Sequence, residues 1–118
     1  MRRVLFVPLW VVAAGCVTSQ VQRVDPDVRP ARAPELVVVL EEPPDQPYAV
    51  IARIESQTNA VFESFDDLRA ELIEQTARLG GQAVIVGPET RESELIVLAT
   101  GTVTSEKKRL TGEVIVFR

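Results

Sequence analysis

The 118-residue chain is acidic, with 17 aspartates and glutamates against 13 lysines and arginines and a formal net charge of −4. This balance argues against a nucleic acid partner, which requires a basic surface. The chain has no histidine and one cysteine, so it lacks the commonest general base and metal ligand and cannot form an internal disulfide. The counts predict one small domain with no catalytic, cofactor-binding or metal-binding residue, stabilised by burial of aliphatic side chains.

Residues 1–15 have the pattern of a secretory signal peptide. Two arginines near the start are followed by a short apolar segment, residues 4–12, and then by the lipobox-like letters AAGC at residues 13–16. The apolar segment is too short to cross a bilayer as a helix. We therefore expect a lipoprotein signal peptide that is cleaved between Gly15 and Cys16.

Cys16 is the only cysteine, and it stands where lipoprotein maturation requires one. Cleavage would make it the new N-terminus, carrying diacylglycerol and a further fatty acid such as palmitate. Several acyl chains anchor firmly because each buried methylene contributes about 0.8 kcal/mol. Val17 in place of aspartate predicts sorting to the outer membrane, facing the periplasm. The alternative is an ordinary secreted protein in which Cys16 is an incidental free thiol.

Residues 16–34 are expected to form the lipidated N-terminus and a proline-rich tether. Pro26, Pro30 and Pro34 recur at four-residue spacing among aspartates and arginines. Proline-rich chain favours polyproline-like extension at about 3.1 Å per residue, so the tether would reach up to about 50 Å from the membrane. This segment is predicted to be disordered and outside the core.

A single α+β domain is expected over residues 35–118. The run at residues 35–40 is rich in β-branched residues and predicts a first strand, which the proline-rich turn at residues 42–47 must end. Residues 48–56 alternate between apolar and polar side chains and predict a half-buried strand. Its apolar face is expected to comprise Val50, Ala52 and Ile54.

A helix is predicted from Phe65 to about Leu79. Ser64 is a good N-cap, the first turn is acidic as the helix dipole favours, and Gly80-Gly81 provides a stop. Seven residues form an apolar stripe at helical spacing, and four charged residues are expected largely off it. The stripe comprises Phe65, Leu68, Leu72, Ile73, Thr76, Ala77 and Leu79, and the charged residues are Arg69, Glu71, Glu74 and Arg78.

Three strands are expected after the helix. Residues 83–86 are uniformly apolar, which predicts an inner strand buried on both faces. A charged loop at residues 89–94 should follow. Two strands, Leu95 to Thr104 and Leu110 to Phe117, should be joined by a hairpin at residues 105–109. The expected order is β-β-α-β-β-β, with one helix packed on one face of a mostly antiparallel sheet of about five strands.

The stretch DLRAELIEQTARLGGQAVIVG at residues 67–87, followed by Gly101-Thr102-Val103, resembles the YbjQ/RcsF-like superfamily. That superfamily typically shows a helix ending in A-x-x-x-G-A-[DN]-A-[VI], a hydrophobic strand and a strand with G-T-A. Here Gly81 and Gln82 stand where alanine and Asp or Asn are usual. The resemblance covers residues 48–103 and implies an α+β fold. Similar members include outer-membrane lipoproteins, among them the Rcs-pathway stress sensor, and domains labelled heavy-metal binding; the resemblance implies no catalytic residue.

Acidic side chains are the first candidates for a site, and each has a structural explanation. The pair Asp66-Asp67 follows Ser64 and is better explained by helix-end electrostatics than by acid chemistry. The pair Glu41-Glu42 and the acidic residues at 89–94 are candidates for a hard cation. Neither has the alternating oxygen ligands and central glycine of a calcium loop. Solvated loop charge is therefore the favoured interpretation.

Basic and aromatic residues give further candidates. Ser105 with Lys107 or Lys108 has the composition of a Ser-Lys nucleophile pair, which needs a desolvated lysine. In a charged turn at residues 105–109 the lysines would instead be solvated or contact anionic lipid head groups. Tyr48 is expected to pack at the start of a strand, and Phe62 to pack ahead of the helix as a hydrophobic staple.

These patterns favour a lipid-anchored, non-enzymatic interaction or structural module of the cell envelope, with the membrane and an unidentified envelope protein as partners. A second hypothesis is a homo-oligomer that associates through an open sheet edge, for which Leu110 to Phe117 is the expected strand. Two further hypotheses are a ligand- or metal-binding domain and a small hydrolase using carboxylates and serine. The sole assigned site is lipidation at Cys16, with cleavage between Gly15 and Cys16.

Overall fold

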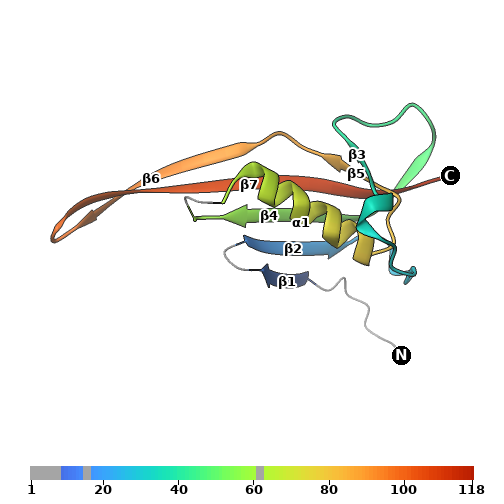
Figure 1. The fold of residues 1–118 in the computed structure, drawn as a ribbon, viewed down its shortest axis with the longest axis horizontal. Coiled ribbons are helices and arrows are strands. Elements are labelled where there is room, and N and C mark those ends of the chain that lie inside the picture. Colours follow the sequence, from blue (N-terminus) through green and yellow to red (C-terminus); the bar gives the residue numbers. More distant parts are fainter. Residues whose placement is uncertain (1–8, 15–16, 61–62) are drawn as a thin grey trace.

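The computed structural model describes residues 9–14, 17–60 and 63–118. One α-helix lies on one face of a mixed, mostly antiparallel sheet (Figure 1), which makes the domain α+β as predicted. The expected order β-β-α-β-β-β with about five strands is wrong in detail, because the described sheet has seven strands and four of them precede the helix. The molecule is elongated, with extents of 55 × 38 × 22 Å, because one β-hairpin projects well beyond the rest of the sheet (Figure 1). Within these residue ranges no helix has both the length and the apolar character needed to cross a membrane.

The sheet order is β1-β2-β4-β7-β5-β3, and β6 also pairs with β7. Every pair is antiparallel except β3 with β5, which is parallel. The helix α1 packs across β2, β4, β5 and β7. The elements are β1 (Leu9–Ala14), β2 (Val17–Arg23), the 3₁₀ helix η1 (Pro34–Leu36), β3 (Val38–Leu40), β4 (Tyr48–Thr58), α1 (Phe65–Arg78), β5 (Ala83–Val86), β6 (Thr90–Leu98) and β7 (Gly101–Phe117).

The main core lies between α1 and the sheet. Leu68 and Leu72 of α1 are fully buried, in one cluster with buried side chains from β2, β4, β5 and β7. Full burial of a leucine side chain contributes about 1.5–3 kcal/mol. A smaller cluster on the opposite face, near β3, is built around Ala83, Ile85 and Ile115. The strand β5 therefore faces apolar side chains on both sides, and the prediction for residues 83–86 is confirmed.

Both predicted ends of the helix are confirmed. The backbone N–H of Asp67 donates to Ser64 Oγ (3.3 Å), and the Asp67 carboxylate accepts from the backbone N–H of Ser64 (2.7 Å), which completes a capping box. After α1, Gly80 has φ +76°, the left-handed conformation that glycine adopts at low cost. A Cβ at Gly81 would collide with the side chain of Val114, so a residue without a side chain fits best there.

The prediction of a disordered tether over residues 17–34 is wrong for its first part. Residues 17–23 form β2, which pairs with β4, and Val17, Ser19 and Val21 are buried toward α1. Every second residue from Val17 to Val21 is small or apolar and faces the core, whereas the residues between them are polar. The prolines that follow led to the prediction of disorder for the whole segment. Beyond β2, the backbone N–H of Arg32 donates to the carbonyl of Ala77 at 2.9 Å, which holds the proline-rich segment against the end of α1.

The C-terminal strands also differ from the prediction. The expected charged loop at residues 89–94 belongs mostly to β6, and β7 runs unbroken through residues 105–109, where a hairpin turn was expected. The turn lies instead at Ala99-Thr100. The charged residues of these two segments predicted loops because charged side chains prefer water. In the sheet they instead form ion pairs with residues of opposite charge on neighbouring strands.

The expected open edge at Leu110 to Phe117 is wrong, because β7 lies between β4 and β5. Its Leu110, Val114 and Ile115 are fully buried, as is typical of a strand covered on both faces. In β4 the predicted strand is confirmed, but the pairing with β7 shifts between Val50 and Ala52. This irregularity places Val50 in the smaller cluster, while Ala52 and Ile54 face α1.

Candidate functional site: the sheet end beside Cys16

Gly15 and Cys16 lie outside the described residues, but the residue bonded to Cys16 has a defined place. Val17 begins β2 and pairs with Thr58 of β4, and Thr58 pairs with Lys108 of β7. These three residues therefore mark one end of the sheet, which we call the anchor end. Because consecutive Cα atoms are about 3.8 Å apart, a lipid attached to Cys16 would be bonded one residue away from this end.

The β6–β7 hairpin projects from the anchor end. Arg91 of β6 pairs with Lys108, and the hairpin continues outward to Leu98 and Gly101. The seven-residue step from Lys108 to Gly101 corresponds to about 23 Å at about 3.3 Å per residue. Figure 1 shows the two strands extending past the ends of β2 and β4. Along this outer part, β7 pairs with β6 and with no other described strand.

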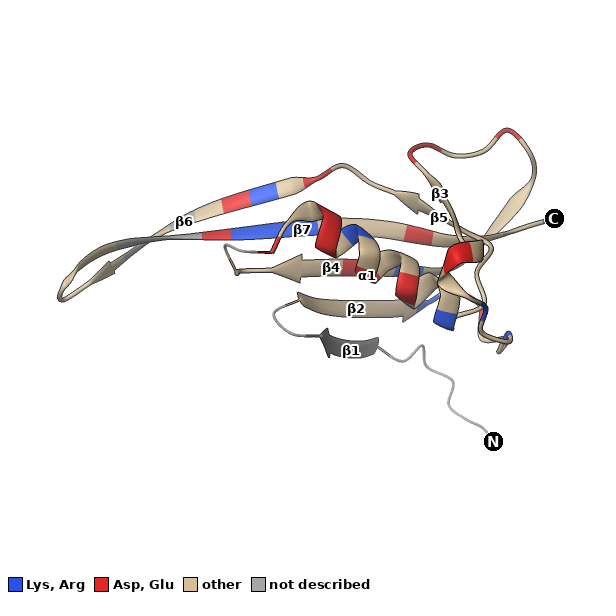
Figure 2. Cartoon of the chain, in the orientation of Figure 1, with Lys and Arg blue, Asp and Glu red and all other residues tan. Residues whose placement is uncertain are grey.

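The outer part of the hairpin, residues 95–104, is named here the hairpin tip. Its sequence LIVLATGTVT contains no charged residue. Leu95 is 66% exposed, Val97 77% and Leu98 48%. The charged positions that Figure 2 shows on β6 and β7 lie nearer the body of the sheet. Exposed apolar side chains at these three positions of a projecting strand are typical of a contact surface.

The base of the hairpin is held to the domain by charged side chains. Lys108 is only 9% exposed, and its ammonium donates to the carbonyl of Glu63 at 3.0 Å. Arg109 pairs with Glu55 of β4 at 3.3 Å and with Glu92 of β6 at 3.2 Å. The prediction that residues 107–109 form a solvated turn is therefore wrong, because all three lie in β7; Lys108 and Arg109 pair with both β4 and β6, and Lys107 pairs with β6.

The Ser105–lysine combination was considered as a nucleophile pair but not favoured from the sequence, and the described contacts of Lys108 do not favour it either. The side chain of Ser105 lies outside the described side chains, and the Lys108 ammonium is directed to Glu63 and lies 3.6 Å from Glu106. A lysine engaged with a carbonyl and a carboxylate is occupied by those contacts, whereas a general base needs a free and desolvated amine.

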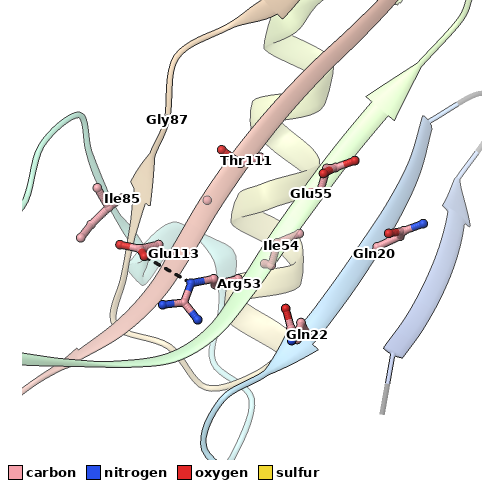
Figure 3. A pocket seen from close by; sticks show the side chains of 10 residues that line it. Gln20, Gln22, Arg53, Ile54, Glu55, Ile85, Gly87, Thr111 and Glu113 are labelled. Atoms are coloured by element: carbon pink, nitrogen blue, oxygen red, sulfur yellow. Dashed lines mark ion pairs between the residues drawn. The ribbon is translucent and has the colours of Figure 1, made fainter. Parts of the chain in front are cut away.

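The face of the sheet opposite α1 carries an open groove of about 480 Å³ (Figure 3). Inside it Arg53 Nε lies 3.4 Å from Glu113 Oε2. Exposed ion pairs of this kind contribute about 0–1 kcal/mol, so this contact fixes neither side chain in one position. The groove is lined by Gln20, Gln22, Arg53, Ile54, Glu55, Ile85, Gly87, Thr111, Gly112 and Glu113.

A polar cluster that the sequence pattern did not predict lies between α1 and the sheet. Ser19 Oγ of β2 donates to Glu71 Oε2 at 3.1 Å and lies 3.0 Å from Ser56 Oγ of β4, and Gln75 Nε2 donates to the same carboxylate oxygen at 2.8 Å. Glu71 was expected off the apolar stripe, yet it is only 8% exposed. The signal in the sequence that could have indicated this cluster is a serine at a core-facing position of each strand, Ser19 in β2 and Ser56 in β4.

The remaining acidic candidates have structural contacts. Glu41 pairs with Arg69 of α1 at 3.0 Å, and Glu92 pairs with Arg109 within the sheet. Across residues 9–14, 17–60 and 63–118 no three potential metal-ligating side chains of Asp, Glu, Cys or His come together. Tyr48 packs in the smaller cluster at the start of β4, as predicted. The predicted staple residue, Phe62, lies outside the described residues.

The capping box gives a stability prediction with a defined pH dependence. Hydrogen bonds from the backbone N–H and the hydroxyl of Ser64 lower the pKa of Asp67, whereas desolvation and the neighbouring Asp67 raise the pKa of Glu63. A lowered carboxyl pKa stabilises the fold above the ordinary Asp pKa of about 3.9, and this contribution is lost as pH falls through the folded-state pKa. The contribution of Glu63 has the opposite sign, since it is lost as pH rises through its raised pKa.

Asp67→Asn is therefore expected to be less stable than the unmodified chain at pH 7, with the difference shrinking once the pH falls below about 4. Urea unfolding at pH 7 and pH 3 measures both values. Asp66→Asn is the matched control because it leaves both capping-box hydrogen bonds in place. A difference that stays constant across this range would show that the Asp67 carboxylate charge does not stabilise the helix end.

No family model and no curated protein matches this chain. Among solved structures, a similar fold is found in the orthorhombic crystal form of a Francisella virulence factor, FvfA, at 14% sequence identity and a TM-score of 0.59. The match covers 83% of this chain and 96% of that one. At this identity the comparison establishes a shared α+β fold alone.

Proposed function

We propose that this chain is a lipid-anchored bacterial envelope protein that acts as a non-enzymatic interaction or structural module. The observation that carries the proposal is the position of Cys16, the only cysteine, directly before β2. Cleavage between Gly15 and Cys16 would fall between β1 and β2 and would interrupt neither strand.

The sheet topology supports removal of residues 1–15. The strand β1 lies at the edge of the sheet and pairs with β2 alone among the described strands. Its loss would leave the order β2-β4-β7-β5-β3 intact, together with the packing of α1 on four of these strands. The mature domain would then keep its helix and every described strand except β1.

The position of β2 changes the expected relation of the domain to the membrane. A disordered tether would have held the domain up to about 50 Å away. With β2 starting at Val17, the acylated residue would be adjacent to the core, and the anchor end would lie at the membrane surface. The proposed module is therefore one that works close to the bilayer, in the outer membrane facing the periplasm.

The non-enzymatic part of the proposal is supported by the placement of the described polar groups. The hydroxyls of Ser19 and Ser56 are fully buried under α1, where a substrate has no access. The open groove holds charges that face each other, without the desolvated acid or base that proton transfer requires. FvfA is described as a virulence factor; a role in the envelope for the present chain, and its likeness to the YbjQ/RcsF-like superfamily, are our proposals.

Cys16→Ala is the variant that tests the anchor. We expect the unmodified protein to be recovered from membranes of a lipoprotein-competent host, with an intact mass that begins at Cys16 and includes diacylglycerol and a fatty acid. Cys16→Ala should lack the lipid mass and retain residues 1–15, because both acylation and the cleavage that follows it require the thiol. Inhibition of signal peptidase II should leave the unmodified precursor uncleaved. A soluble protein without lipid, or normal maturation under the inhibitor, would refute the proposal.

A further inference from the structure

We infer that the hairpin tip is a second membrane contact, which rests in the interfacial layer of the same bilayer that holds the lipid on Cys16. This inference rests on the proposed function, since it requires the anchor end to face the membrane. The occupant of the surface formed by the exposed side chains of Leu95, Val97 and Leu98 is then lipid, at the boundary between head groups and acyl chains.

The first argument is position. The register Val17–Thr58–Lys108 places the start of β2 and the base of the hairpin at one end of the sheet. From there the hairpin runs outward, away from the body of the domain (Figure 1). A lipid bonded to Cys16 and the hairpin tip would therefore approach the bilayer from the same side of the domain.

The second argument is chemistry. Leu95, Val97 and Leu98 expose 66%, 77% and 48% of their surface, and the tip carries no charge. The adjoining parts of β6 and β7 carry charges of both signs (Figure 2), with Arg91 and Lys107 beside Glu92 and Glu106. An uncharged apolar segment bordered by charges of both signs suits the membrane interface, where apolar groups enter the acyl boundary and charged groups remain among the head groups.

The third argument is that the tip is held in its projecting position. Arg109 forms ion pairs with both neighbouring strands, and Lys108 donates to the carbonyl of Glu63. The guanidinium of Arg91 lies over the Phe65 ring of α1, 5.4 Å from its centre, within the range of a cation–π contact. The base of the hairpin is thus joined to the domain on both strands, which limits folding back of the tip onto the domain.

The backbone of the hairpin sets the depth of insertion. The outer strands have unpaired peptide groups along their free edges, and such edges are not tolerated in dry hydrocarbon. The backbone must therefore stay among head groups and water, while the side chains reach about 5–10 Å into the boundary, as for other interfacial segments. Because the tip extends about 23 Å beyond Lys108, the strands must be tilted toward the membrane plane.

The test uses the lipidated protein in vesicles of phosphatidylethanolamine and phosphatidylglycerol. Acylation consumes the only native thiol, so Val97→Cys supplies a single site for an environment-sensitive fluorophore. Asp45→Cys is the matched control, since Asp45 is exposed in the loop before Tyr48, at the opposite end of the sheet. We expect the Val97 label to emit at shorter wavelength in vesicles and to be quenched several-fold more by a head-group quencher than the Asp45 label.

Each other outcome overturns the inference in a distinguishable way. If the intact mass shows lipid on Cys16 but the Val97 label emits as in water and escapes the quencher, the tip does not touch the membrane and the proposed anchor still stands. If the label is shielded equally with and without vesicles, a second copy or another protein surface covers the tip. If the mass lacks lipid, the proposed function fails and the inference fails with it.

Discussion

Leu72→Ala is expected to lower the free energy of unfolding by about 2–5 kcal/mol, the range for deletion of a fully buried leucine side chain. Leu72 is 0% exposed at the centre of the α1–sheet interface. One of its methyl carbons lies close to Gly112 of β7, only 3.3 Å from where a Cβ would be. Small domains have about 5–15 kcal/mol of stability in total, so this single truncation should remove a large part of it.

Urea unfolding of the full chain in the absence of lipid measures this loss. Leu95→Ala is the matched control, since it deletes the same atoms from a side chain that is 66% exposed, and we expect a change within about 0.5 kcal/mol. Equal losses for the two variants would mean that α1 does not pack on the sheet as the structure describes.

Glu71→Ala is expected to cost about 1–3 kcal/mol, because it leaves buried donors without their acceptor. The Glu71 carboxylate accepts from Ser19 Oγ and Gln75 Nε2, and Ser19 is fully buried. Glu71→Gln keeps an acceptor oxygen and should cost less. Glu74→Ala is the control on the same helix, since its pair with Arg78 is exposed and is expected to contribute about 0.3–0.5 kcal/mol.

A double-mutant cycle with Ser19→Ala isolates the interaction between the helix and β2. We expect the two losses to be non-additive, because both substitutions remove the same hydrogen bond. Additive losses would show that Glu71 and Ser19 stabilise the fold independently. The interaction matters for the proposed function because β2 directly follows Cys16, so this buried cluster joins the strand next to the proposed lipidation site to α1.

The sequence by itself determined the elements whose signals are local. The ends of α1 follow from Ser64 and Asp67 at the start and Gly80 at the stop, since capping depends on atoms within one turn. The strand β5 follows from four consecutive apolar residues that Gly87-Pro88 closes. The cleavage and lipidation site at Cys16 is likewise a local motif, and it remains a prediction from the sequence.

The tertiary structure alone decided the features that depend on partners distant in the chain. Val17 to Arg23 became a strand because β4 offers hydrogen bonds and a buried face, which the following prolines concealed in the sequence. Charged residues 106–109 continue β7 because carboxylates and arginines of neighbouring strands lie opposite them. Burial of Glu71 depends on two serines that come from separate strands earlier in the chain. The placement of the hairpin tip beyond the start of β2 follows from strand register, which local composition does not specify.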